Sequence, residues 1–314
     1  MTPPSTNLLR LSRQLFTDDE TGRAAFLAAL EKPQPYQPAV LWMQERPDTL
    51  PFATAERPDW LPEFVDLSAP GERPGQSEMH EQGAYYCLDV SSVFAASVMR
   101  EVPSGPEVVL DVCASPGGKS LFAWRSLRPH LLVANEVIAK RTAPLISNLK
   151  RCRVQPCMVT NADTAVLARV CPASADVVIV DAPCSGQSLI AKGVENDGCF
   201  HPANINLNAN RQRRILANAA AVVAPDGWLA YITCTYAEKE NEGNLRWLLR
   251  HFPDFTAMPV PALEAHRSSL TDTPCYRLWP QGGVGAGAFA ALLRRNGAGC
   301  RGGLDGLRSA WRSA

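Results

Sequence analysis

Long apolar runs and export signals are both missing from this 314-residue sequence. No run approaches the roughly eighteen apolar residues of a membrane-spanning helix, so we expect no transmembrane segment. The first residues, MTPPSTNLLRLSRQ, lack an apolar core followed by a small-residue cleavage site. This argues against secretion and predicts a cytoplasmic protein, which we expect to be monomeric. The 31 basic residues balance the 31 acidic ones, so net charge gives no hint of a nucleic-acid partner.

The ten cysteines also lack any C-x-x-C spacing. A zinc finger or ribbon is therefore not expected, and we predict no metal site. Without an export signal, a disulfide framework is not expected either. Most of these cysteines should be reduced and buried, as free cysteine usually is, and the exceptions are the ones of interest.

Composition and hydrophobic pattern divide the chain into three parts. Residues 1–105 contain a helical pattern at 18–31, with a capping box from Thr17 to Glu20, then a proline-rich stretch to about residue 75. We assign this part to a small α+β accessory module. Residues 106–296 alternate short apolar runs with helical patterns, which predicts an α/β domain with a mostly parallel sheet. Residues 297–314 are rich in Gly and Arg and are predicted to be a loose tail or a short added helix.

A glycine-rich turn follows the first predicted strand, at Asp111-Val-Cys-Ala-Ser-Pro-Gly-Gly-Lys-Ser120. A P-loop needs Gly where Cys113 stands, and no G-x-G-x-x-G occurs, so neither common phosphate-binding motif fits. The turn instead suits a nucleoside ligand without a triphosphate. Glu136 ends the next predicted strand, where a carboxylate can accept both ribose hydroxyls. Asp163, after the third strand, could accept the exocyclic amine of an adenine.

Two cysteines follow neighbouring predicted strands. One motif is Asp181-Ala-Pro-Cys-Ser-Gly186, and the other is Thr233-Cys234-Thr235. Ligands of open α/β sheets bind outside the carboxyl ends of the strands, so both cysteines should face the same crevice as the glycine-rich turn. Two thiols there, with Asp181 beside one of them, indicate a nucleophile site.

These motifs together resemble the NOL1/NOP2/Sun-type RNA 5-methylcytosine methyltransferases, including their bacterial ribosomal-RNA branch. The resemblance rests on DVCASPGGKS, NEVIAKRTAPLISNLKR, NAD, DAPCSG and ITCTYAEKENE in that order, and it covers residues 82–295. It implies a Rossmann-like core with a seven-stranded sheet and S-adenosylmethionine as the methyl donor. It also implies methyl transfer to C5 of a cytosine in RNA, with ribosomal RNA favoured over tRNA. Residues 1–80 resemble the family's RNA-binding module only loosely.

The resemblance also implies roles for individual residues. Cys234 would be the nucleophile that adds to C6 of cytosine, Cys184 would assist release, and Asp181 would face both donor and base. The residues implied for cofactor binding are Cys113, Ala114, Ser115, Pro116, Gly117, Gly118, Lys119, Glu136, Arg141, Asp163 and Asp181. Ser115 replaces the commoner Ala. The segment 187–202 differs from the family's basic, Trp-containing stretch, which bears on the RNA that is recognised.

Several alternatives stay open from sequence. Pro183-Cys184 resembles the nucleophile motif of DNA cytosine-5 methyltransferases, although the Thr-Cys-Thr motif favours Cys234. Methylation of an exocyclic nitrogen is less favoured, because the aromatic residue of an Asp-Pro-Pro-Tyr motif is absent. A catalytically silent RNA-binding or assembly factor is also less favoured, because both thiols and Asp181 are intact. Three groups of basic residues could contact RNA phosphates: Lys140, Arg141, Lys150, Arg151 and Arg153; Arg211, Arg213 and Arg214; and Arg294, Arg295, Arg301, Arg308 and Arg312.

Overall fold

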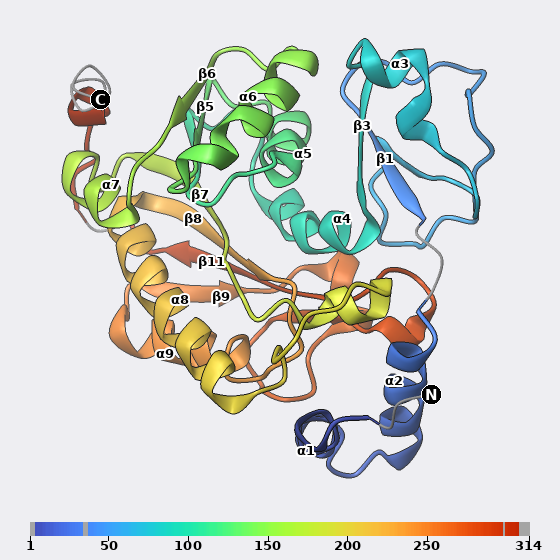
Figure 1. The fold of residues 1–314 in the computed structure, drawn as a ribbon. Helices are drawn as coiled ribbons and strands as arrows, with labels where there is room; N and C mark the ends of the chain where they lie inside the picture. The colour runs from blue at the N-terminus through green and yellow to red at the C-terminus, as the bar shows by residue number, and fades with distance from the viewer. Residues whose placement is uncertain (1–3, 34–36, 298, 308–314) are drawn as a thin grey trace.

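The structure, a computed structural model, describes residues 4–33, 37–297 and 299–307 (Figure 1). Its main sheet has five parallel strands in the order β6-β5-β4-β7-β8, followed by antiparallel strands on the β8 side. The strands of this sheet are β4 (Val108–Asp111), β5 (Leu131–Asn135), β6 (Cys157–Thr160), β7 (Ala175–Asp181), β8 (Val223–Thr233), β9 (Phe255–Met258), β10 (Tyr276–Leu278) and β11 (Ala288–Arg295).

The predicted α/β class with a mostly parallel sheet is confirmed, and the strand count differs by one. Eight strands are present among the described residues rather than seven, because β9 and β10 both pair with β11. The chain order reverses at β4, which pairs with β5 on one side and β7 on the other. Such a reversal opens a crevice at the carboxyl ends of the strands.

Helices cover both faces of the main sheet. Alternate residues of each strand point to opposite faces, so Val109 packs in one core and Leu110 in the other. Figure 1 shows α8 and α9 across the sheet from α5 and α6. On one side are α4 (Val90–Ala96), η2 (Ser97–Glu101), α5 (Gly118–Leu127), η3 (Ala139–Arg141) and α6 (Thr142–Arg151); on the other are α7 (Thr164–Val170), α8 (Pro202–Val222) and α9 (Glu242–His251).

The N-terminal part contains strands, as expected for an α+β module, although the sequence pattern did not place them in or beside the proline-rich region. A three-stranded antiparallel sheet has the order β2-β1-β3 and is joined by the indole of Trp42, which donates to Asp66 over 2.7 Å. The elements of this region are β1 (Pro38–Trp42), β2 (Val65–Leu67), η1 (Pro74–Gln76), α3 (Glu78–Glu81) and β3 (Tyr85–Asp89).

Two N-terminal helices, α1 (Thr6–Leu15) and α2 (Glu20–Glu31), pack away from this small sheet (Figure 1). The α2 helix contacts η4 (Gln187–Lys192) and η6 (Pro280–Gly282) of the later chain, and α1 packs against α2. The predicted capping box is wrong, because Asp19 caps α2 by accepting from the Gly22 N–H. Because α4 packs against β8 and β11, residues 1–105 contact the main domain at several places, and the boundary at 105 stays a prediction.

The C-terminal segment is docked as far as the structure describes it. Arg301 donates to Asp176 over 3.0 Å, and Leu307 is buried against the core beside α7. Residues 308–314 of the predicted tail lie outside the described residues. The remaining helical turn, η5 (Pro261–His266), connects β9 to β10.

Candidate active site

The two cysteine motifs meet at the carboxyl edge of the main sheet. Asp181 at the end of β7 pairs in register with Ile232 of β8, so the segments after both strands leave the sheet together. The Sγ atoms of Cys184 and Cys234 lie 3.0 Å apart. Cys234 is exposed and Cys184 is half-buried, which leaves Cys234 as the more accessible sulfur. The sequence-based expectation that both thiols face one crevice agrees with this geometry.

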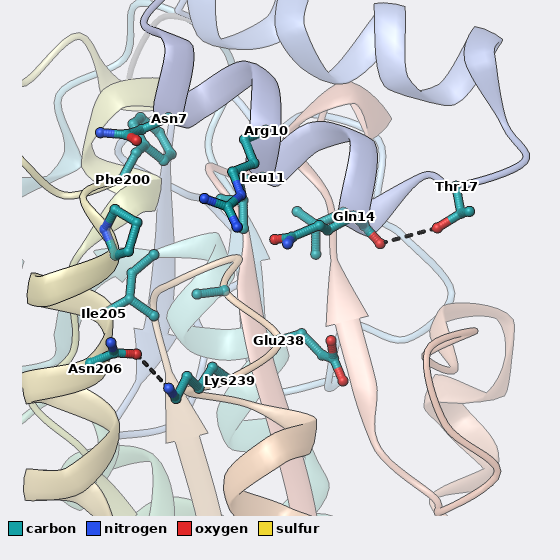
Figure 2. A pocket seen from close by; sticks show the side chains of 13 residues that line it. Asn7, Arg10, Leu11, Gln14, Thr17, Phe200, Ile205, Asn206, Glu238 and Lys239 are labelled. Atoms are coloured by element: carbon teal, nitrogen blue, oxygen red, sulfur yellow. Dashed lines mark hydrogen bonds between the residues drawn. The ribbon is translucent and has the colours of Figure 1, made fainter.

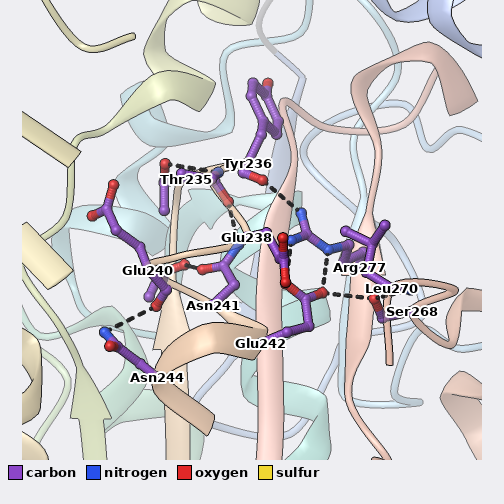
Figure 3. Close-up of polar contacts among 12 residues, drawn as sticks. Thr235, Tyr236, Glu238, Glu240, Asn241, Glu242, Asn244, Ser268, Leu270 and Arg277 are labelled. Carbon is purple, nitrogen blue, oxygen red and sulfur yellow. Dashed lines mark hydrogen bonds and ion pairs between the residues drawn. The ribbon is translucent and has the colours of Figure 1, made fainter. Parts of the chain in front are cut away.

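Hydrogen bonds join the loops that carry the two cysteines. The Ser185 and Thr235 hydroxyls are 2.7 Å apart, and each directly follows one of the cysteines. The Thr233 hydroxyl donates to Asn241 over 2.6 Å, and the Asn241 amide donates to the Thr235 carbonyl over 2.9 Å (Figure 3). Because residues on both sides of Cys234 are tied to Asn241, the position of this sulfur is set by the turn that follows it.

The buried carboxylate of Glu240 supports the loop that contains Cys184 through hydrogen bonds, a role that no sequence pattern indicated. Its Oε2 accepts from the Ser185 N–H over 2.9 Å and from Gln212 over 2.8 Å, and Gln212 also donates to the Pro183 carbonyl. Burial raises the pKa of Glu240. The signal for it was the ITCTYAEKENE motif, which contains Glu240 but does not show which loop it contacts.

A buried ion pair anchors the turn after Cys234 (Figure 3). Arg277 donates to both carboxylate oxygens of Glu242, at 2.6 and 2.5 Å, and to the Tyr236 carbonyl at 3.0 Å. Ser268 donates to the same carboxylate over 2.6 Å. Both charged side chains are almost completely buried, so this pair connects β10 rigidly to the start of α9.

Lys119 lies between the glycine-rich turn and the cysteines. Its ammonium is 2.7 Å from Asp181 and 3.3 Å from the Ser92 hydroxyl. Burial alone would lower the pKa of Lys119, but the Asp181 carboxylate raises it above its usual value. Lys119 therefore stays charged and places a cation beside the thiol pair.

The two thiols differ in acidity. The hydrogen bond from Cys184 lowers the pKa of Cys234, against burial and Asp181, with help from Lys119 and Lys192. The same hydrogen bond, burial and the charge of Glu240 raise the pKa of Cys184. Lys119 and Lys192 act on Cys234 against Asp181, whereas the buried Glu240 acts on Cys184, so the surroundings favour the thiolate at Cys234 over Cys184.

The glycine-rich turn is held by Asp111 at the end of β4. Its carboxylate accepts from the Cys113 N–H over 3.2 Å and from the Ser120 hydroxyl over 2.6 Å. Burial raises the pKa of Asp111 to about 7. Burial also raises the pKa of Cys113, so this thiol stays protonated and is not suited to be a nucleophile.

Backbone hydrogen bonds to neighbouring elements hold the remaining residues of the turn. The Ala114 N–H donates to the Asn135 carbonyl over 2.8 Å, and the exposed Pro116 accepts from Asn148 over 2.9 Å. Gly117 has a φ of +115°, which disfavours any side chain there, and Gly118 begins α5. The turn thus leads directly into the N-terminus of a helix.

Glu136 and Arg141 adjoin the turn. Glu136 is buried, its Oε1 accepts from the Ile138 N–H over 2.9 Å, and its Oε2 lies 3.4 Å from Arg141. Arg141 donates to the Ser115 carbonyl over 2.7 Å, and the Ser115 hydroxyl donates back to the Arg141 carbonyl over 2.8 Å. Arg141 therefore joins the glycine-rich turn to the predicted ribose-binding carboxylate.

Two apolar side chains beside Glu136 were missed by sequence reasoning. Val137 is 53% exposed and Ile138 is 43% exposed, which is unusual for side chains of this size. The signal in the sequence was the apolar pair directly after Glu136, the carboxylate that we predict to bind ribose. Asp163 is exposed at the start of α7, where its Oδ1 accepts from the Ala165 N–H over 2.8 Å.

Several of the arginines proposed to contact RNA have structural partners instead. Arg295 pairs with Asp254 at 2.9 Å, Arg213 donates to Asn244, and Arg151 lies over the ring of Tyr86. Those that stay exposed near the sheet's carboxyl edge include Lys140 and Arg141 on η3. Arg308 and Arg312 lie outside the described residues.

The described residues contain no group of three or more His, Cys, Asp or Glu side chains that could hold a metal ion. Within the same residues, every helix is too short or too polar to cross a bilayer.

Comparisons with known proteins agree with this geometry. The family model described as 16S rRNA methyltransferase RsmB/F matches residues 99–294. Ribosomal RNA small subunit methyltransferase F from Pectobacterium atrosepticum is 30% identical over 274 residues, which cover 86% of this chain and 54% of that protein. The protein of the same name from Escherichia coli O17:K52:H18 is 30% identical over 70% of this chain and 47% of its own length. The chain thus spans about half the length of these relatives.

Solved structures show the same fold. A methyltransferase homologue from Pyrococcus horikoshii has a TM-score of 0.73 at 22% identity and covers 92% of this chain and 97% of its own. NSun6 from Pyrococcus horikoshii with SFG has a TM-score of 0.69 at 17% identity, and the match covers 93% of this chain and 98% of NSun6. The resemblance predicted from the motifs is confirmed, and since the family model matches more than half of the sequence, this chain belongs to the 16S rRNA methyltransferase RsmB/F family.

Proposed function

We propose that this protein transfers a methyl group from S-adenosylmethionine to C5 of a cytosine in ribosomal RNA, acting as a monomer in the cytoplasm. The observation that carries the proposal is the thiol pair, with 3.0 Å between Cys184 and Cys234 and the Lys119–Asp181 ion pair beside it. Family membership supports RNA as the substrate class, and the similarity to ribosomal RNA small subunit methyltransferase F favours ribosomal RNA over tRNA.

The residues at the crevice fit S-adenosylmethionine. A buried carboxylate at Glu136 suits a ribose, and the exposed apolar Val137 and Ile138 beside it suit the flat face of an adenine. Asp163 and the backbone of Cys113–Lys119 complete the set that we assign to this ligand. When bound, it supplies an electrophilic methyl group on a sulfonium. The Cys234 end of the crevice would hold the cytosine.

Cys234 overcomes the low nucleophilicity of C5 in cytosine. Its thiolate adds to C6, a sulfur–carbon bond forms, and the electrons of the C5–C6 double bond become available at C5 to take the methyl group. A free thiol is only a few per cent ionised at neutral pH. The lowered pKa of Cys234, caused by Cys184 and then Lys119 and Lys192, provides the thiolate.

We assign Asp181 and Cys184 to the proton transfers. Addition at C6 places negative charge on the ring, which N3 can accept if it receives a proton. We assign Asp181 to take a proton from the Lys119 ammonium, 2.7 Å away, and to pass it to N3; Lys119, charged in the free protein, is then neutral until N3 returns the proton. Release then requires the C5 proton to leave while the sulfur–C6 bond breaks and the double bond reforms. Cys184, beside the departing sulfur, gives its thiol proton to the Cys234 thiolate that leaves with the sulfur–C6 electron pair and takes up the C5 proton in exchange, while N3 returns its proton to Asp181.

The test uses the purified chain, radiolabelled S-adenosylmethionine and 16S rRNA, both free and assembled in small subunits. We expect label in 5-methylcytidine after digestion of the RNA to nucleosides, and bisulfite sequencing then locates the position. Label in N4-methylcytidine would contradict C5 chemistry. Absence of transfer to either substrate, with no 5-methylcytosine lost from the RNA of a deletion strain, would favour a silent assembly factor instead.

A further inference from the structure

A pocket of about 580 Å³ lies between α1 and the start of α8 (Figure 2). It adjoins residues 234–241, which connect β8 to α9 and contain Cys234; we call this segment the catalytic loop. One wall comes from α1, the opposite wall from Phe200 and the first turn of α8, and the floor from Ala237–Lys239. None of the roles assigned above uses this pocket. Its volume is in the range of pockets that bind small molecules or parts of larger ones.

The floor of the pocket continues the segment that carries Cys234. Ala237 follows Cys234 by three residues, so their Cα atoms can be at most about 11 Å apart. Tyr236, between them, packs edge-to-face against Phe26 of α2 with ring centroids 5.0 Å apart. The α1–α2 pair is therefore fixed on the catalytic loop by a shared apolar cluster that also includes Leu11 and Leu15.

The lining of the pocket is cationic and aromatic. Arg10 extends from α1 into it (Figure 2), and no described residue forms an ion pair with Arg10. Lys239 is exposed and donates to the amide of Asn206 rather than to an acid. Glu238 is the one acid in the lining, and Arg246 pairs with it. The ring of Phe200 is half-buried; it packs against the apolar cluster of α1 and α2 and also lines the pocket.

We propose that this pocket binds the RNA strand next to the target cytosine, with a phosphate at Arg10 and Lys239 and an unstacked base against Phe200. The proposal rests on the proposed function, because it takes RNA as the substrate. Single-stranded RNA is bound by cations that follow its backbone and by aromatic rings on which bases stack, which is the combination present here. A cytosine must leave its stack to reach Cys234, and a grip on its neighbour would hold it unstacked.

The test measures binding of the full chain to a fluorescently labelled 20-nucleotide single-stranded RNA at several salt concentrations. Arg10→Ala should raise the Kd about fivefold and reduce the slope of log K against log salt by about 0.7, the value for one phosphate contact on a single strand. Phe200→Leu should raise the Kd at least about fivefold without changing the slope of log K against log salt. Phe200→Tyr should bind RNA with the Kd of the wild type, because stacking needs only an aromatic ring. Arg13→Ala is the matched control, since Arg13 is an exposed arginine of α1 outside the pocket.

Affinity for S-adenosylmethionine and the melting temperature of each variant report whether the fold is intact, and Arg10→Ala, at an exposed position, should change neither. The proposal requires both effects, so an Arg10→Ala or Phe200→Leu variant that binds RNA like Arg13→Ala would overturn it. That result would leave the proposed function in place if the wild type methylates cytosine in 16S rRNA. Failure of methylation by the wild type would contradict the proposed function itself, whatever the binding data show.

Discussion

The sulfur atoms of Cys184 and Cys234 lie 3.0 Å apart although fifty residues separate them in the chain. The contact is asymmetric, because Lys119 and Lys192 act on Cys234 while the buried Glu240 acts on Cys184. One sulfur is thereby prepared to be a thiolate and the other to stay a thiol that donates to it.

Replacing each cysteine should separate their roles. With RNA that contains 5-fluorocytidine, Cys234→Ala should give no covalent protein–RNA band, because no sulfur adds to C6. Cys184→Ala should still form the adduct, and with ordinary RNA it should accumulate it, because release is slowed. Gel electrophoresis under denaturing conditions measures both. The reverse pattern would make Cys184 the nucleophile, as the Pro-Cys motif alone suggests.

Removing the cation at residue 119 should make Cys234 less reactive. Lys119→Met takes away a positive charge and leaves the Asp181 carboxylate unpaired, and both changes raise the pKa of Cys234. We expect the rate of Cys234 alkylation by iodoacetamide at pH 7 to fall about five- to tenfold, and the alkylation profile to move to higher pH. Mass spectrometry identifies the alkylated sulfur.

Lys32→Met, on the exposed end of α2, is the control for the loss of one lysine. An alkylation profile for Lys119→Met that coincides with that of Lys32→Met would show that Lys119 does not act on the thiol.

Mild oxidation should inactivate the enzyme reversibly. Hydrogen peroxide oxidises the Cys234 thiolate to a sulfenic acid, and Cys184 can then displace water from it to form a disulfide, since its sulfur is already beside it. We expect a Cys184–Cys234 linked peptide by mass spectrometry, and recovery of methylation with dithiothreitol. In Cys184→Ala, the same treatment should leave oxidised Cys234 without a disulfide. Inactivation of wild type without that linked peptide would contradict the prediction.

The parallel core could be predicted from sequence because each of its strands is a short apolar run between turn residues. Val108–Asp111 and Ala175–Asp181 are buried on both faces, which is what such runs indicate. The strands of the small α+β module could not be placed from sequence, because β1 and β2 lie in a proline-rich region whose composition is typical of loops. The α1 helix was missed although Leu8, Leu11 and Leu15 have helical spacing. These residues pack in one cluster with Tyr236 and Ala286, which are far away in the sequence.

The active site, like the fold, could be predicted only in part from the sequence. The motifs placed Cys184, Cys234 and Asp181 at one edge of the sheet, because strand ends in a parallel sheet share an edge. They could not show that Lys119 reaches Asp181, or that Glu240 supports the Cys184 loop, because those contacts depend on side-chain positions across neighbouring loops. Sequence motifs after the strands thus locate the site, whereas the contacts that shift the pKa values of the two cysteines depend on how the side chains pack.

The buried pair of Glu242 and Arg277 should be required for stability (Figure 3). Glu242→Gln leaves the Arg277 charge buried without a counter-charge, which should cost about 3–5 kcal/mol of unfolding free energy at pH 7. Glu242→Gln combined with Arg277→Met should recover part of it. Urea denaturation measures these values, and Glu264→Gln, which breaks the solvent-exposed pair with Arg267, should cost far less than Glu242→Gln.

The pH dependence of this effect has a definite sign. Burial alone would raise the pKa of Glu242, but Arg277 lowers it below its usual value, so the pair stabilises the fold above about pH 4.5. That stability is lost as pH falls through the folded-state pKa and Glu242 becomes neutral. The difference between wild type and Glu242→Gln should therefore be large at pH 7 and shrink at progressively lower pH. A constant difference across that range would mean that the glutamine is poorly accommodated for reasons of shape, because a charge effect must vanish when the carboxylate is protonated.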